Sequence, residues 1–124
     1  LSINEKENII TAAKSKVLEQ KYTTYEGITN TLQSQAETLQ KEFSVFDTQQ
    51  KELKRQLDLL GDVNENSSQE DIIAYNNLVT QNNQLMKSYE QLKNREQVIL
   101  KEYDKANDYL SKVYTELGYD ATSF

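Results

Sequence analysis

The chain has 124 residues, a net charge of −6, 36% hydrophobic residues, and no proline, cysteine or histidine. Without histidine the chain lacks the commonest general base and metal ligand, and without cysteine it forms no disulfide. Its 14 basic residues are scattered among 20 acidic ones, which argues against nucleic-acid binding because that binding requires clustered Lys and Arg. The absence of proline favours helix almost throughout, and the low hydrophobic content predicts a narrow contact between long helices.

The first predicted helix covers about residues 3–60. Ser2 and Glu5 have the spacing of a capping box, which places the helix start at Ile3. Its opening phase is Ile3, Ile10, Ala13 and Val17. From residue 18 onward an apolar side chain returns every seventh residue, which is the pattern of a coiled-coil contact row. The members of this row are Leu18, Tyr25, Leu32, Leu39, Phe46, Leu53 and Leu60.

The change of phase falls just before Thr23, Thr24 and Gly27, which are residues of poor helix propensity. One continuous helix with a local stutter is the expected arrangement. The alternative is a kink or short break at residues 23–27, which would produce three helices.

Residues 61–68 form the predicted tip loop. Gly61 suits the left-handed position that ends a helix, and the residues after it are turn formers. Alternating Asp and Asn oxygens resemble the opening of a calcium loop, but Ser67 and Ile73 replace the glycine and the bidentate glutamate of that loop. An acidic, hydrated turn is therefore expected, and no metal site. The weak candidate ligands are Asp62, Asn64, Asn66 and Glu70.

The second predicted helix covers about residues 69–117, capped by Ser67 with Glu70 or by Ser68 with Asp71, and a short tail follows at 118–124. Its apolar positions alternate in steps of three and four, as one face of a helix requires. This row is Tyr75, Leu78, Asn82, Leu85, Tyr89, Leu92, Glu96, Ile99, Tyr103, Ala106, Leu110, Val113 and Leu117.

A short loop makes the two helices antiparallel neighbours. Folding the chain about residue 65 keeps the two rows matched along their length. The expected pairs are Leu53 with Leu78, Phe46 with Leu85, Leu39 with Leu92, Leu32 with Ile99, and Leu18 with Val113. The predicted fold class is therefore all-α, a single long antiparallel two-helix hairpin, or coiled coil.

The second helix has more apolar surface than one partner helix needs, which is typical of a helix in a bundle. We expect this surplus row to bind a protein partner, most simply a second copy of the chain that completes a four-helix bundle. The alternative is a monomer that leaves the row half exposed. The row consists of Ile72, Val79, Met86, Leu100 and Tyr114.

Enzymatic activity is not expected. Paired acid–base catalysis needs carboxyl groups in a pocket that separates their pKa values, and a thin hairpin offers no such pocket. We therefore expect no cofactor and no small-molecule substrate. No apolar run is long enough to predict insertion of this segment into a membrane. At the end remote from the tip, Tyr109, Tyr119 and Phe124, with Ile3 and Ile9, either cover the open end of the hairpin or bind something there.

The segment from Ile73 to Val79 reads Ile-Ala-Tyr-Asn-Asn-Leu-Val. It resembles the AYNxLV-type repeats in helical, extracytoplasmic segments of cell-envelope proteins from low-GC Gram-positive bacteria, and the abundance of Asn, Gln, Lys and Tyr fits the same source. The resemblance covers less than a tenth of the chain. It implies a location outside the cytoplasm, often as part of a lipoprotein, and a role as a spacer or partner-binding arm.

The expected function is that of a non-enzymatic structural or interaction module, a scaffold or spacer that binds a protein partner or itself. The alternative is a secretion-related chaperone or adaptor, or a secreted effector segment, that holds a client on its helical face. A membrane-active helical protein is a third hypothesis, which the acidic tip disfavours.

Overall fold

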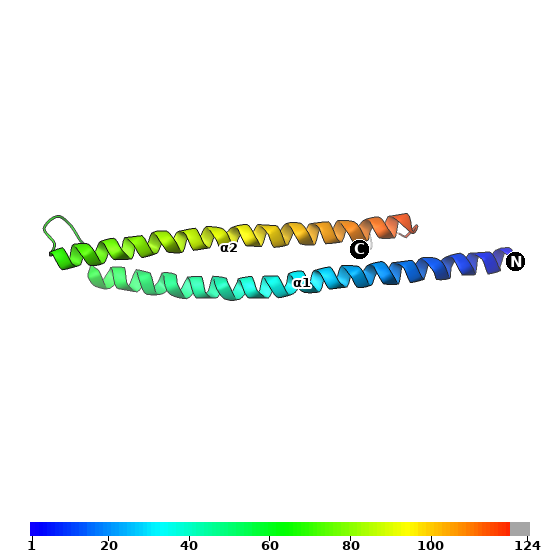
Figure 1. Ribbon diagram of the computed structural model, residues 1–124, viewed down its shortest axis with the longest axis horizontal. Helices are drawn as coiled ribbons and strands as arrows, with labels where there is room; N and C mark the ends of the chain where they lie inside the picture. Colours follow the sequence, from blue (N-terminus) through cyan, green and yellow to red (C-terminus); the bar gives the residue numbers. More distant parts are fainter. Residues whose placement is uncertain (120–124) are drawn as a thin grey trace. The chain divides into compact units, whose positions relative to one another are not determined.

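The computed structural model describes residues 1–119, and within that range the chain forms two helices and no strand. Helix α1 spans Ile3–Leu60 and helix α2 spans Gln69–Glu116. They form an antiparallel two-helix hairpin (Figure 1), as predicted. The second helix ends one residue earlier than expected, and residues 120–124 of the predicted tail lie outside the described part of the chain.

The hairpin divides into two compact units. The first unit combines Leu1–Gln35 with Val98–Phe124, of which residues up to 119 are described, and the second unit is Ala36–Gln97. Each unit therefore contains a segment of α1 and an antiparallel segment of α2. Because the two helices continue from one unit into the other, the same repeat of apolar residues builds both.

Side-chain and glycine caps define the ends of both helices. The backbone N–H of Glu5 donates to Ser2 Oγ at 3.1 Å, and that of Asp71 donates to Ser68 Oγ at 3.2 Å. Of the two caps considered for α2, Ser68 is therefore the one used. Gly61 and Gly118 follow the helix ends with φ of 73° and 82°, the left-handed conformation that ends helices.

Helix α1 continues without a break through residues 23–27. The hydroxyls of Thr23 and Thr24 donate to the carbonyl oxygens of Glu19 and Gln20, at 3.0 and 3.3 Å. Both β-branched residues thus satisfy their hydroxyls within the helix. The continuous-helix expectation is confirmed, and the three-helix alternative is wrong.

The core lies along the two predicted rows. In the first unit α1 contributes Leu32 and α2 contributes Ala106, Leu110 and Val113. In the second unit the buried side chains are Leu39, Phe46 and Leu53 from α1 and Leu78, Leu85 and Leu92 from α2. Every buried hydrophobic side chain in residues 1–119 belongs to a row identified from the sequence.

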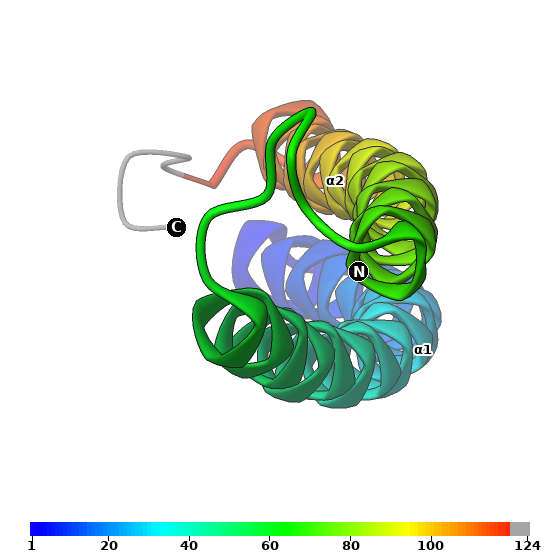
Figure 2. The same ribbon diagram turned by 90° about the vertical axis from the view of Figure 1, so that its left-hand side faces the viewer.

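In the second unit, the contact of Phe46 is displaced by four residues, or about one turn, from the predicted register. Folding about residue 65 places Phe46 opposite Leu85, whereas the ring of Phe46 lies against Tyr89, with 4.9 Å between ring centroids. The displacement accompanies the path of the tip loop. Helix α2 extends past the end of α1, so that Leu60 lies beside Ala74 and Leu78, and residues 61–68 return along the first turn of α2 (Figures 1 and 2).

In the first unit a hydrogen bond between Tyr25 and Asn107 connects the two helices. The hydroxyl of Tyr25 donates to Asn107 Oδ1 at 2.9 Å, and the ring of Tyr25 also lies 5.8 Å from that of Tyr22, between centroids. Tyr25 is half-buried, so its ring covers the contact row while its hydroxyl reaches the edge.

Candidate interaction surface

The predicted partner-binding residues are divided between the two units. Ile72, Val79 and Met86 lie in the second unit, and Leu100 and Tyr114 lie in the first. Leu100 is 51% exposed, whereas the other four are half-buried within the chain itself. The ring of Tyr114 packs edge-on against Tyr119, with 5.9 Å between centroids.

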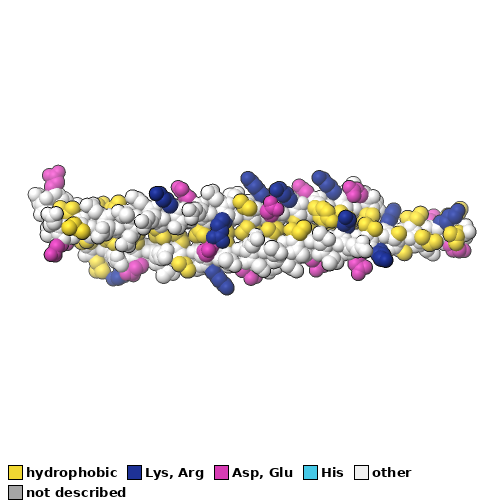
Figure 3. Space-filling model, in the orientation of Figure 1, with side chains coloured by type: hydrophobic (Ala, Val, Ile, Leu, Met, Phe, Trp, Pro, Cys, Tyr) yellow, Lys and Arg dark blue, Asp and Glu magenta, His cyan; other side chains and the backbone are white. Residues whose placement is uncertain are grey.

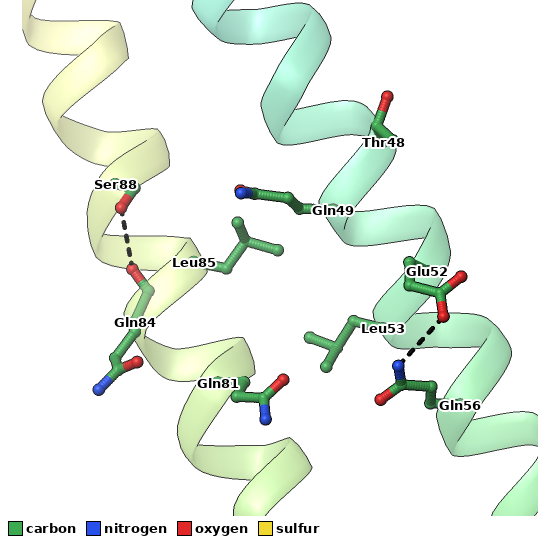
Figure 4. A pocket seen from close by; sticks show the side chains of 9 residues that line it. All are labelled: Thr48, Gln49, Glu52, Leu53, Gln56, Gln81, Gln84, Leu85 and Ser88. Carbon is green, nitrogen blue, oxygen red and sulfur yellow. Dashed lines mark hydrogen bonds between the residues drawn. The ribbon is translucent and has the colours of Figure 1, made fainter.

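On the other side of the contact row, the second unit has a hollow of about 490 Å³ between the two helices. Leu53 of α1 and Leu85 of α2 form its floor and point toward each other (Figure 4). Gln49 and Gln56 line it from α1, and further amides line it from α2. The hollow therefore combines an apolar floor with rims that donate and accept hydrogen bonds.

Two further hollows continue this one. A hollow of about 440 Å³ shares Gln49 and Ser88 with it, and another of about 380 Å³ shares Gln56. Together they make a groove along one face of the second unit, which we call the glutamine groove. Its apolar residues are Val45, Phe46, Leu53, Leu59, Leu60, Ala74, Leu78, Leu85 and Leu92, and its uncharged polar residues are Thr38, Thr48, Gln49, Gln56, Asn77, Gln81, Gln84, Ser88 and Gln91.

Most charged side chains on the groove take part in ion pairs of the chain itself. Arg95 of α2 pairs with Glu42 of α1 at one end. Near the middle, Arg55 pairs with Glu52 at 2.6 Å. The hydrogen bond from Arg55, with a second one from Gln56, lowers the pKa of Glu52 to about 2. Glu52 therefore stays ionised at neutral pH with its charge balanced by Arg55, and the other polar side chains in the middle of the groove are neutral amides and hydroxyls.

Large side chains fill the space on the opposite side of the contact row. The ring of Tyr89 lies between Phe43 and Phe46, with centroid distances of 6.1 and 4.9 Å. Helical geometry places Ile72, Val79 and Met86 on this side of the Leu78, Leu85 and Leu92 row. These three members of the surplus row therefore lie on the same side as Phe43 and Tyr89, and the groove is on the side that the apolar pattern of the sequence did not indicate.

A signal for the groove is nevertheless present in the sequence. Gln49 and Gln56 are seven residues apart on α1, and Asn77, Gln84 and Gln91 repeat at the same interval on α2. Residues seven apart share one face of a helix in contact with another. Uncharged polar side chains that repeat beside both apolar rows indicate this face, whereas the apolar pattern alone does not.

Two of the weak metal candidates at the tip, Asn64 and Asn66, are engaged in turn formation. Asn64 Oδ1 accepts from the backbone N–H of Asn66 at 2.8 Å, and Ser67 Oγ accepts from that of Asn64 at 2.9 Å. These contacts are those of an Asx turn and its neighbour. Within residues 1–119, no three acidic side chains are grouped so that they would hold a metal ion.

Neither helix of the described chain has a segment that is both apolar and long enough to cross a membrane. Comparisons with protein-family models, with curated proteins and with solved structures find no match to this chain. The groove, the exposed apolar side chains and their charged neighbours are therefore the basis for proposing a function.

Proposed function

We propose that this chain is a non-enzymatic interaction module, a coiled-coil scaffold or spacer that binds an amphipathic helix of a protein partner in the glutamine groove. The observation that carries the proposal is the open groove itself. Val45 and Leu59 remain 56% and 74% exposed on it, although each is a large apolar side chain. Covering them with an apolar surface would be favourable, because it removes that area from water.

The shape of the groove favours a helix as the ligand. Leucines recur along its floor at intervals of seven, so a third helix with apolar residues at the same spacing packs along it. From Thr38 to Leu60 the groove follows about 23 residues of α1, or roughly 34 Å at 1.5 Å per residue. A partner helix of about 21 residues matches this length.

The chemistry of the rims predicts the flanks of that helix. Neutral amides on both rims attract neither sign of charge, so the ligand should carry Gln, Asn, Ser or Thr beside its apolar row. The same chemistry disfavours catalysis. Glu52, an acid on the rim, has a lowered pKa, whereas a general acid at neutral pH needs a raised one.

The test uses a fluorescein-labelled synthetic peptide of about 21 residues, with leucine at the contact positions and glutamine and alanine elsewhere. Fluorescence anisotropy should show binding in the micromolar range, which is ordinary for a small interface. Val45→Lys with Leu59→Lys should weaken binding at least about tenfold, since two lysines would then lie against the apolar row of the peptide.

Val98→Lys is the matched control, because Val98 is an exposed valine that does not line the groove. This variant should bind the peptide like the unchanged chain. Equal affinity of the Val45 and Leu59 double variant, or equal affinity for a scrambled peptide that has lost its apolar row, would contradict the proposal.

The flexible glutamine rims favour one second candidate, an adaptor that holds varied client helices. Long unbranched amides can change rotamer to meet different neighbours, and they make few demands on the ligand. A scaffold with one partner should distinguish peptides that share the leucine row and differ in their flanks. An adaptor should bind such peptides with affinities within about threefold of one another.

A further inference from the structure

The first residues of α1 lie beyond the end of α2 in the first unit. Helix α2 ends at Glu116, and Gly118 lies next to Lys14, whose Nζ would be 3.8 Å from a Cβ at that glycine. Residues 3–13 therefore extend past α2 (Figure 1), and Figure 3 shows hydrophobic side chains between charged ones on this end of α1. Within the described residues 1–119, this stretch is helical without a neighbouring helix.

Three large apolar side chains lie on one face of α1 in and just after that stretch. Ile3, Ile10 and Val17 are spaced by seven residues and are 76%, 54% and 39% exposed. We call them the N-terminal row. The row is offset by one residue, or about 100° around the helix, from Leu18 and Tyr25, which face α2. A second helix can therefore pack on the N-terminal row without displacing α2.

The row is symmetric about Ile10, and this symmetry indicates how a second copy would pair. Two antiparallel copies centred on Ile10 place Ile10 against its counterpart, and Ile3 of each copy against Val17 of the other. Each pair has a β-branched side chain on both sides, so the packing is the same at each level. A twofold axis through the centre makes the interface self-complementary.

The charges beside the row support the same arrangement. Glu7 and Lys14 flank the row on one edge, seven residues apart. In the antiparallel pair, Glu7 of each copy lies on the same edge as Lys14 of the other and within one residue of its level, so opposite charges meet twice. In a parallel pair, Glu7 would face the position of Ser2 or Ile9, and no charge would be compensated. Charge complementarity therefore selects a second copy in antiparallel orientation.

We propose that the N-terminal row is a self-association site, at which two copies of this chain pair antiparallel through about 15 residues, or roughly 22 Å, of α1. The proposal rests on the proposed role in protein interaction, but it uses a surface separate from the glutamine groove. So short an overlap would not order isolated peptides. Here the rest of α1 packs against α2 and already holds the stretch helical, so the pair forms with low to moderate affinity and is sensitive to salt.

Orientation is tested first, by disulfide formation in the full chain. The sequence contains no cysteine, so every disulfide that forms joins introduced cysteines. One variant carries Ile3→Cys and a second variant carries Val17→Cys, and the two are mixed under mild oxidation. Disulfide dimers between the two variants should form at least about tenfold faster than dimers of the Val17→Cys variant with itself, because the antiparallel arrangement places residue 3 of one copy opposite residue 17 of the other. A faster Val17→Cys homodimer would indicate parallel pairing and overturn the proposal.

Charge reversal tests the pairing without cysteine. Sedimentation equilibrium of the unchanged chain should show a monomer–dimer equilibrium between about 10 μM and about 1 mM. Glu7→Lys and Lys14→Glu should each weaken self-association about tenfold, because each variant brings like charges together twice. An equimolar mixture of the two variants should associate within about twofold of the unchanged chain, since the heterodimer restores both ion pairs.

The two proposals fail separately. Leu59→Lys, on the glutamine groove, should leave self-association unchanged, and Ile10→Asp should abolish self-association while leaving peptide binding in the groove intact. A chain that stays monomeric at about 1 mM overturns the self-association site. So does a mixture of the charge variants that associates no better than either variant alone.

Discussion

Leu110 occupies the most enclosed position among the described large side chains, with 0% of its surface exposed. It lies on the α2 side of the first unit, where it packs toward α1. We expect Leu110→Ala to lower the free energy of unfolding by about 2–5 kcal/mol, because it removes buried methyl groups and leaves a cavity. Leu100→Ala in the same helix should cost less than about 1 kcal/mol, since that side chain is half exposed. Urea-induced unfolding monitored by circular dichroism would measure the free energy of unfolding of both variants. Equal losses for the two variants would contradict the predicted packing.

Glu52 should titrate well below an ordinary glutamate. Its pKa is lowered to about 2 by the hydrogen bonds from Arg55 and Gln56. Because the folded-state pKa lies below the unfolded one, the stabilisation is fully present above about pH 4.5 and is lost as the pH falls toward 2. Both side chains are exposed, so the effect on stability is small. In NMR titrations, Arg55→Ala should return the pKa of Glu52 toward 4.5. The control Lys54→Ala should leave the pKa of Glu52 low. A low pKa of Glu52 in Arg55→Ala would show that the hydrogen bond from Arg55 is not the cause of the shift.

Which individual residues are buried was largely predictable, because the seven-residue repeat assigns each side chain to the contact row or to the surface. Leu39, Leu53, Leu85 and Leu92 were placed this way. The capping residue of α2 was not determined, since Ser67 and Ser68 each have an acidic residue three positions later. Only the path of the loop distinguishes them: Ser67 turns back to the N–H of Asn64, which leaves Ser68 for the helix.

At the scale of the elements, Gly27 is a weak point inside a long helix. A Cβ at this position would meet nothing within 4 Å, and the backbone is helical. Gly27→Ala should therefore stabilise the protein by about 0.5–1 kcal/mol, because alanine loses less conformational freedom on folding.

Gly61 is the matched control for this substitution. It also has open space around it, but its φ is 73°, which side chains with a Cβ rarely adopt. Gly61→Ala should destabilise the protein by about 1–2 kcal/mol. Thermal unfolding of the two variants should shift the midpoint in opposite directions. A shift of the same sign in both would show that the left-handed conformation at residue 61 does not matter.

The candidate site was less predictable than the helices. The surplus row was recognisable because apolar residues at a helical spacing are conspicuous, and Phe43 and Tyr89 pack together on the same side of the contact row. The volume of the side chains decides which side of a two-helix contact stays open. A pattern of apolar and polar residues does not distinguish large side chains from small ones, so it does not predict the open side. The register was displaced for a related reason, because the path of residues 61–68 determines how far α2 extends past α1.

At the scale of the whole chain, protection of backbone amides from exchange should follow the burial of the contact rows. The amides of core residues such as Phe46, Leu85 and Leu110 should exchange slowest, because they are freed only when packed helices separate. Amides of residues 3–13 should exchange fastest among helical ones at low concentration, since they lie beyond α2. Hydrogen exchange with mass spectrometry would show this order, and uniform protection along α1 would contradict it.

The described part of the chain buries no polar or charged side chain. In the second unit, apolar side chains that repeat every seven residues therefore face one another, and sliding one helix past the other by seven residues would restore apolar contacts at almost every level. The polar contacts between the helices, such as that of Arg95 with Glu42, lie at exposed edges and penalise such a slip only weakly. The length of the connection between the helices is then the main obstacle to misaligned hairpins. Insertion of several flexible residues at the tip should produce folded chains in more than one alignment, and these would interconvert only by parting the helices.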